Sequence, residues 1–185
     1  MNRALSITLS VLAVLGTEVG AGCSDPVRTA QIEALGPDTE APNQDHRPGQ
    51  PCVLCHSEGG PAESKSFAIA GTVYETRKVG SKGAPAVVVQ FVDANGNKPA
   101  AIPETGPTGN FYVPIEDWPD LAFPVRVAIY DREGDPPLQV MKSLIGREPS
   151  CNFCHQPNVD PKETDDPATT IDLSRASAGQ IYKTL

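Results

Sequence analysis

The chain has 185 residues, with 15 basic against 23 acidic side chains, and a formal net charge of −8 at pH 7. A surface of this sign disfavours nucleic acid and anionic lipid headgroups, and it favours solubility or a basic protein partner. We therefore expect no nucleic-acid partner. Beyond the N-terminal region, no apolar run is long enough to cross a membrane as a helix.

Residues 1–22 predict an export signal. Arg3 supplies positive charge, and the apolar stretch at residues 5–16 is too short to span a bilayer. The run from Val19 to Cys23 resembles a bacterial lipoprotein cleavage site, although Gly20 stands where a leucine is usual. The resemblance implies a lipid anchor on Cys23 and export to the periplasm or cell surface of a bacterium. An ordinary secretory signal with one additional cysteine is the alternative.

Residues 23–51 predict a lipoprotein-like tether. The segment is rich in Asp, Glu, Asn and Gln, and prolines interrupt it at positions 26, 37, 42, 48 and 51. This composition favours an extended, solvated linker that would hold the folded part away from a membrane. A short helical turn near residues 29–35 is the exception that we expect.

Two copies of the pattern Cys-x-x-Cys-His follow, at residues 52–56 and 151–155. This spacing is typical of covalent c-type haem attachment, in which both thiols bond the haem and the histidine binds its iron. The motifs use four of the five cysteines and two of the three histidines. The sequence therefore predicts two covalently attached haem c groups, and the chain resembles an exported dihaem c-type cytochrome. The attachment residues would be Cys52, Cys55, Cys151 and Cys154, and the axial ligands His56 and His155.

Other chemistry of Cys-x-x-Cys has to be weighed against haem. A zinc site built from four thiolates would leave the two adjacent histidines unexplained. A redox dithiol of the thioredoxin kind would need a βαβ context, which the sequence does not suggest. A pair of structural disulfides is the third alternative, because the predicted compartment is oxidising.

The sixth iron ligands have two candidates. His46 is the remaining histidine and precedes the first motif closely, so it could bind iron or be a solvated linker residue. Met141 could complete a His/Met haem with a raised potential. We favour a packing role for Met141, because methionine commonly fills gaps in a core.

The region between the motifs predicts a mainly β fold, a small immunoglobulin- or transthyretin-like β-sandwich. Short segments rich in β-branched and aromatic residues alternate with turn sequences. Asn95-Gly96 favours a tight hairpin after the second of these segments. We divide the chain into a first haem segment (52–66), a β-sandwich domain (67–145), and a second haem segment with C-terminal tail (146–185). The expected strands are 67–74, 86–92, 111–115, 125–130 and 138–144.

Three runs in this region, residues 70–74, 92–96 and 108–112, resemble the carboxypeptidase-regulatory-like group of transthyretin-type sandwiches. The resemblance implies a structural or binding module without catalysis. In the tail, residues 163–167 are acidic, and 173–182 could form one or two helical turns. The motifs flank the sandwich, and the sequence leaves open whether they meet at one end of it.

The leading function is electron transfer by a dihaem cytochrome, with redox proteins as partners. Each iron would cycle between its ferrous and ferric states. The chain would be an electron carrier, not an enzyme, and a lipid anchor would be its one link to a membrane. A small haem peroxidase, a redox-enzyme subunit, and a structural surface module stapled by haem are the alternatives, and self-association is compatible with haems at both ends.

Overall fold

The computed structural model describes residues 25–38, 41–156 and 178–184. The predicted export signal, Cys23 and the acidic stretch at residues 163–167 lie outside the described residues. Within the described ranges, no helix combines the length and apolar character that a membrane crossing requires.

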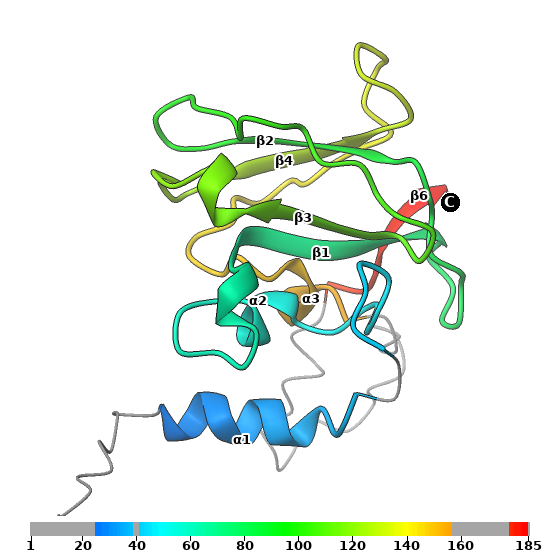
Figure 1. The fold of residues 1–185 in the computed structure, drawn as a ribbon. Coiled ribbons are helices and arrows are strands. Elements are labelled where there is room, and N and C mark those ends of the chain that lie inside the picture. The colour runs from blue at the N-terminus through cyan, green and yellow to red at the C-terminus, as the bar shows by residue number, and fades with distance from the viewer. Residues whose placement is uncertain (1–24, 39–40, 157–177, 185) are drawn as a thin grey trace, which may run out of the picture.

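Two three-stranded sheets form the framework of the described chain and its helices are few, which confirms the prediction of a mainly β fold. In the first, β1 pairs antiparallel with β3 and parallel with β6. In the second, β4 pairs antiparallel with β2 on one side and β5 on the other. Figure 1 shows the β2–β4 layer lying over the β3–β1 layer. The strands are β1 (Phe67–Thr76), β2 (Val88–Val92), β3 (Asn110–Pro114), β4 (Arg126–Tyr130), β5 (Gln139–Val140) and β6 (Ile181–Thr184).

Side chains from both sheets share one hydrophobic core. Phe91 of β2 lies at its centre, with ring centres 6.0 Å from Phe111 of β3 and 6.2 Å from Trp118. Tilted aromatic pairs at these separations add to the stability that burial of their area provides. β-Branched residues at alternate positions of the strands fill the rest, among them Ile69, Val73, Val89, Val113 and Ile129.

Strand β1 is buried on both faces, from Ala68 to Tyr74. Ile69 and Val73 face the shared core. The opposite side of the strand is covered by two single-turn helices, α2 (Cys52–Cys55) and α3 (Cys151–Cys154), which Figure 1 shows beneath β1. The two Cys-x-x-Cys-His motifs therefore meet on one strand, which answers the geometric question that the sequence leaves open.

The expected tight hairpin at Asn95-Gly96 is wrong. The chain does turn there, with Gly96 at φ +84° and Asp93 accepting hydrogen bonds from the backbone N–H groups of Asn95 and Asn97. After a longer loop it pairs back on β2 through an isolated bridge between Val88 and Glu104. The next strand, β3, then joins the other sheet, where Phe111 and Val113 enter the shared core.

The segment before the first motif is more ordered than a solvated tether. The expected helical turn near 29–35 is a longer helix, α1 (Pro26–Ala34), with Asp25 accepting N-cap hydrogen bonds from Val27 and Arg28. Aspartate as N-cap and proline at the first helical position are a strong start signal. The backbone of residues 44–50 is bonded to side chains of the first sheet and of Asn152 in α3.

The structure corrects two further expectations. Tyr182 lies in β6, and the helical turns expected at 173–182 therefore do not extend to it, while residues 173–177 lie outside the described part. The expected strand at 138–144 is reduced to the two residues of β5. Short 3₁₀ turns complete the described elements, η1 (Glu63–Lys65) and η2 (Ile115–Asp117).

Candidate functional site

Each Cys-x-x-Cys-His motif forms one helical turn. In α2 the N–H of His56 donates to the carbonyl of Cys52 (3.0 Å), and in α3 the N–H of His155 donates to that of Cys151 (2.9 Å). Residues three apart on a helix lie on the same face. The two thiols of each motif are therefore presented together, with the histidine directly after the turn.

The motif histidines share one hydrogen-bonding arrangement. Nδ1 of His56 lies 2.8 Å from the carbonyl oxygen of Lys65, and Nδ1 of His155 lies 2.9 Å from that of Gly179. A carbonyl can only accept, so Nδ1 carries the proton in both rings, and Nε2 of the neutral ring keeps a lone pair. Burial lowers the pKa of both histidines, which favours the neutral ring. Proteins orient metal-binding histidines in this way.

Both carbonyl partners are held by local structure. Lys65 ends η1, and the following Phe67 donates its N–H to the carbonyl of His56 at 2.9 Å, which closes the loop after the first motif. Gly179 precedes β6, and Ala178 next to it donates to the carbonyl of Cys154 at 2.7 Å. The last described residues of the chain thus complete the second motif.

The C-terminal segment that carries Gly179 is anchored by side chains. Gln180 donates to the carbonyl oxygens of Thr76 (2.5 Å) and Lys78 (2.8 Å) at the end of β1. Lys183 of β6 forms an ion pair with Asp131, directly after β4. Contacts with both sheets therefore fix the position of the carbonyl that binds His155.

The thiols of Cys52, Cys55 and Cys151 favour the protonated form. Burial raises the pKa of Cys52 to about 11. Burial, followed by the nearby Cys52, raises the pKa of Cys151 to about 12. Burial also raises the pKa of Cys55, although Arg47 and Arg28 oppose it. Reactive Cys-x-x-Cys dithiols have a lowered thiol pKa, so this electrostatic setting weighs against a redox dithiol.

A buried polar network joins the two motif segments. Asn152, inside the second motif, donates from Nδ2 to the carbonyl of Gln50 (2.8 Å), directly before the first motif, and to Oγ1 of Thr72 (3.0 Å). Its Oδ1 accepts from the backbone N–H of Thr72 at 3.2 Å. That N–H points to the edge of β1 where no strand pairs, between the Ala70–Ser150 bridge and β6.

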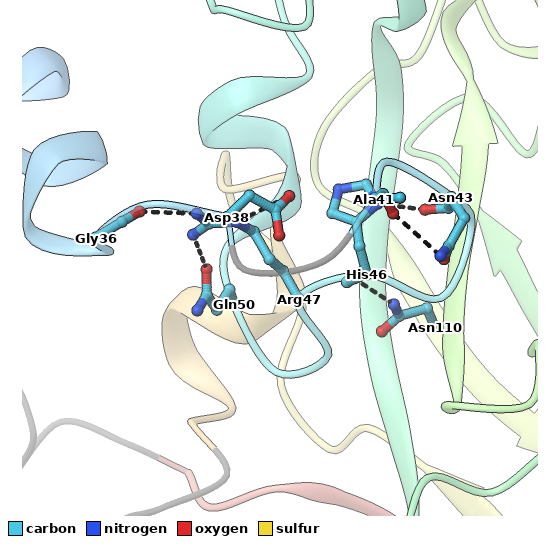
Figure 2. Close-up of polar contacts among 8 residues, drawn as sticks. All are labelled: Gly36, Asp38, Ala41, Asn43, His46, Arg47, Gln50 and Asn110. Atoms are coloured by element: carbon cyan, nitrogen blue, oxygen red, sulfur yellow. Dashed lines mark hydrogen bonds and ion pairs between the residues drawn. The ribbon is translucent and has the colours of Figure 1, made fainter.

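His46 lies beside the first motif. Its ring centre is 5.8 Å from that of His56, with the planes inclined by 37°. Its Nδ1 is bonded to the carbonyl of Asn43, so this ring also presents Nε2 as its remaining nitrogen. Figure 2 shows Asn110 of β3 donating to the main-chain carbonyl of His46, at 2.9 Å.

Arg47 fixes the other side of the same loop. It pairs with Asp38 at 3.3 Å and donates to Gln50 and to the carbonyl of Gly36, both at 2.7 Å (Figure 2). Arg47 also has a left-handed backbone, with φ +50°. The loop that carries His46 is therefore tied to the segment after α1 as well as to β3.

Three rings stack in sequence next to the first motif. The His56 ring lies 4.2 Å from that of Phe67, and Phe67 lies 4.5 Å from Tyr112, each pair nearly parallel. The stack adds an apolar wall beside the imidazole. Phe67 and Tyr112 belong to neighbouring strands of the first sheet, β1 and β3.

Met141 packs against the hydrophobic core and not beside the His46–His56 pair. Its N–H donates to Val127 of β4 at 3.1 Å, and its side chain packs, partly buried, against the hydrophobic core. The structure thus gives this residue the packing role that we favour for it. Cys23, the predicted lipid-bearing residue, lies outside the described residues.

Several residues of the site carry no sequence signal. Thr72 lies in β1, Asn110 begins β3 and Asn152 occupies a variable position of the second motif, and only the fold brings them together. The carbonyl groups of Lys65 and Gly179 are main-chain atoms that any residue would supply.

Comparison with known protein families, curated proteins and solved structures finds no match for this chain.

Proposed function

We propose that this protein is a dihaem c-type cytochrome that transfers electrons. One observation carries the proposal: each motif presents two cysteines on one helical turn, followed by a histidine whose Nδ1 is bonded to a main-chain carbonyl. This arrangement leaves Nε2 for a metal, and its polarised hydrogen bond makes the ring a better ligand. The donor set fits covalent haem with a proximal histidine.

The residues of the two motifs would have matching roles. Cys52 and Cys55 would hold one haem covalently and Cys151 and Cys154 the other, with His56 and His155 as axial ligands. Haem iron supplies reversible one-electron chemistry when bound, at a potential set by its ligands and surroundings. The protein's part is to fix the two imidazoles, to exclude water with apolar neighbours such as Phe67, and to keep the two motifs together.

We further propose that His46 is the sixth ligand of the first iron. The ring centres of His46 and His56 lie 5.8 Å apart, so the imidazole of His46 is within reach of a metal bound to His56. His46 also has its Nδ1 on a main-chain carbonyl, as the two motif histidines do.

The contact between the motifs supports electron passage within one molecule. Asn152 of the second motif is bonded to Gln50 beside the first, and the Cys52 thiol is close enough to affect the pKa of Cys151. We propose that the two sheets form a transthyretin-type β-sandwich of the carboxypeptidase-regulatory-like kind, which supports the haems without taking part in catalysis. Export to the periplasm or cell surface, a lipid on Cys23 and a redox protein as partner belong to the same proposal.

The test is the haem content and redox behaviour of the purified holoprotein. We expect two haems per chain that stay with the polypeptide after denaturation in acidified organic solvent, and reversible one-electron waves. Cys52→Ser with Cys55→Ser should lower the count to one, as should Cys151→Ser with Cys154→Ser. Release of all haem into the solvent, or a chain that binds zinc in its place, would overturn the proposal.

A further inference from the structure

We infer that Thr72, Asn110 and Asn152 form a positioning network through which the second motif holds the His46 loop against the first. The inference rests on the proposed function, because the loop matters as the carrier of an iron ligand. It extends that function by assigning roles to three side chains outside the ligand set. Asn152 lies between the two cysteines of the second motif but acts, in this view, on the first iron.

Thr72 is the centre of the network. Its hydroxyl donates to Oδ1 of Asn110 (2.8 Å) and accepts from the backbone N–H of Gly49 (2.8 Å) and from Nδ2 of Asn152 (3.0 Å). The hydroxyl thus uses its donor and both acceptor sites. Thr72 is fully buried, so each of these bonds is formed away from water.

The network bonds to one loop at four main-chain atoms. Asn110 donates to the carbonyl groups of Gln44 (3.4 Å) and His46 (2.9 Å). Thr72 accepts from the N–H of Gly49, and Asn152 donates to the carbonyl of Gln50. The loop from residue 44 to residue 50 is therefore held by three buried or nearly buried polar side chains.

The chemistry of the three residues indicates that the network orients the His46 loop and does not only stabilise the fold. An apolar residue at position 72 would suit a buried β-strand better than a hydroxyl that needs three partners. A fully bonded polar network selects one geometry, because every displaced member leaves a buried group without a partner. Here the geometry selected is that of the loop bearing His46.

The coupling works in both directions. Asn152 can bond to Gln50 and Thr72 only when α3 is packed on β1, so the second motif must be in place for the loop to be fully held. By linkage, a change in the second motif shifts the binding of His46 to the first iron, and loss of His46 binding weakens the packing of α3. His46 ligation thus depends on a residue of the other haem motif.

The experiment compares variants of the holoprotein by electron paramagnetic resonance. His46→Ala defines the part of the low-spin ferric signal that depends on His46. We expect Thr72→Val and Asn152→Ala to lose the same component, although neither removes an iron ligand, and Thr72→Ser to restore it because it keeps the hydroxyl. Haem content is measured in each variant, so that proteins with two haems are compared.

Thr105→Val is the matched control. Thr105 is a second buried threonine, and its hydroxyl donates to the carbonyl of Ala84 (2.6 Å) and accepts from the N–H of Val87 (2.9 Å), outside the network. We expect it to lower the unfolding temperature in the way that Thr72→Val does and to leave the signal unchanged.

The outcomes separate the inference from the proposed function. A full His46-dependent signal in both Thr72→Val and Asn152→Ala overturns the network and leaves the dihaem assignment standing. No effect of His46→Ala in a protein with two haems overturns the inference and the assignment of the sixth ligand, but not the haems. Wild-type protein without covalent haem overturns the function and the inference together.

Discussion

The imidazole rings of His46 and His56 lie 5.8 Å apart, centre to centre, and each has its Nδ1 on a main-chain carbonyl. Because the rings come from a loop and a helical turn, their approach depends on how the loop is held. Asn110 holds it through the carbonyl of His46, and Arg47 through Asp38 and Gln50. The distance between the two rings therefore depends on all the contacts that hold the His46 loop beside the first motif.

If the proposed haems are bound, replacement of His46 by alanine should change the coordination of the first iron alone. Loss of the second imidazole removes the strong ligand field on one side of the first iron, so the low-spin ferric signal of that iron should give way to a high-spin one. Gln44→Ala is the control, because it changes an exposed side chain of the same loop whose carbonyl alone is bonded. An unchanged low-spin signal in His46→Ala would show that this histidine binds no iron.

Gly71 should not tolerate a methyl group. A Cβ built there would lie 2.7 Å from Cβ of Cys151 and 2.8 Å from Cζ of Phe111. Overpacking of this kind costs about 1–3 kcal/mol, and the helical turn α3 has to move away from β1 to relieve it. Gly71→Ala should therefore lower the free energy of unfolding measured in urea and reduce haem attachment at the second motif.

Gly146→Ala is the matched control for this prediction. A Cβ at Gly146 would meet no atom within 4 Å. We expect its unfolding curve to overlay that of the wild type. Equal stability of the two variants would mean that Cys151 does not pack on β1 as described.

The strands show what the sequence could predict. Runs such as residues 67–74 and 125–130 are rich in β-branched residues and lie within one or two positions of β1 and β4. The turn at Asp93–Asn97 could also be predicted from its sequence, but the strand pairing after it could not, because β3 pairs with β1 in the other sheet. β6 could not be predicted, since a four-residue parallel strand forms only where β1 offers an edge.

In the candidate site, too, some residues could be predicted from the sequence and others could not. The cysteines, His56 and His155 follow from spacing alone. The approach of His46 to His56 does not, and neither does the network through Thr72, because both depend on contacts between segments far apart in the chain. The N-terminal segment was predicted to be solvated from its prolines and polar residues, but its main-chain groups found partners on the first sheet.

Met141→Leu should leave the irons of the two proposed haems unchanged. Met141 packs against the core and its N–H is bonded to Val127, so a swap that nearly conserves volume costs less than about 1.5 kcal/mol. The optical spectrum of the ferric protein is the measurement. Loss of a long-wavelength methionine–iron band in the variant would instead identify Met141 as a ligand.

Asp93 should make the fold sensitive to acid. Burial alone would raise the pKa of Asp93. Hydrogen bonds from Asn97, Ala122 and Asn95 lower the pKa by more than burial raises it, so the net shift is downward. A group with a lowered pKa in the folded state contributes stability above its unfolded pKa, about 3.9. That contribution is lost as the pH falls through the folded value.

The test of this prediction is the urea midpoint of Asp93→Asn as a function of pH. At neutral pH the variant should unfold at a lower urea concentration than the wild type, and the gap should close as the pH falls below about 4. Asp120→Asn, at an exposed position, should follow the wild type at each pH. A gap that stays constant with pH would show that the Asp93 carboxylate makes no charge-dependent contribution.

Arg28 should decide whether α1 stays docked. The helix has no buried residue, yet Arg28 donates to the carbonyl groups of Leu54 (2.9 Å), Glu58 (2.5 Å) and Ser57 (3.3 Å), and to the Ser57 hydroxyl (2.5 Å). A guanidinium group can meet several acceptors in one plane, and a lysine ammonium cannot match that fork. Arg28→Lys should therefore release α1 while keeping the charge.

Hydrogen exchange of residues 26–34 measures the release, because a short helix without packing is marginal in water. We expect fast exchange in Arg28→Lys and wild-type rates in the control Arg77→Lys, at an exposed position. Only Ser24 and Asp25 separate Cys23 from α1, so a lipid on Cys23 would be connected to the first motif through the docked helix. Slow exchange in Arg28→Lys would mean that other contacts hold α1 in place, and the orientation relative to a membrane would then not depend on this arginine.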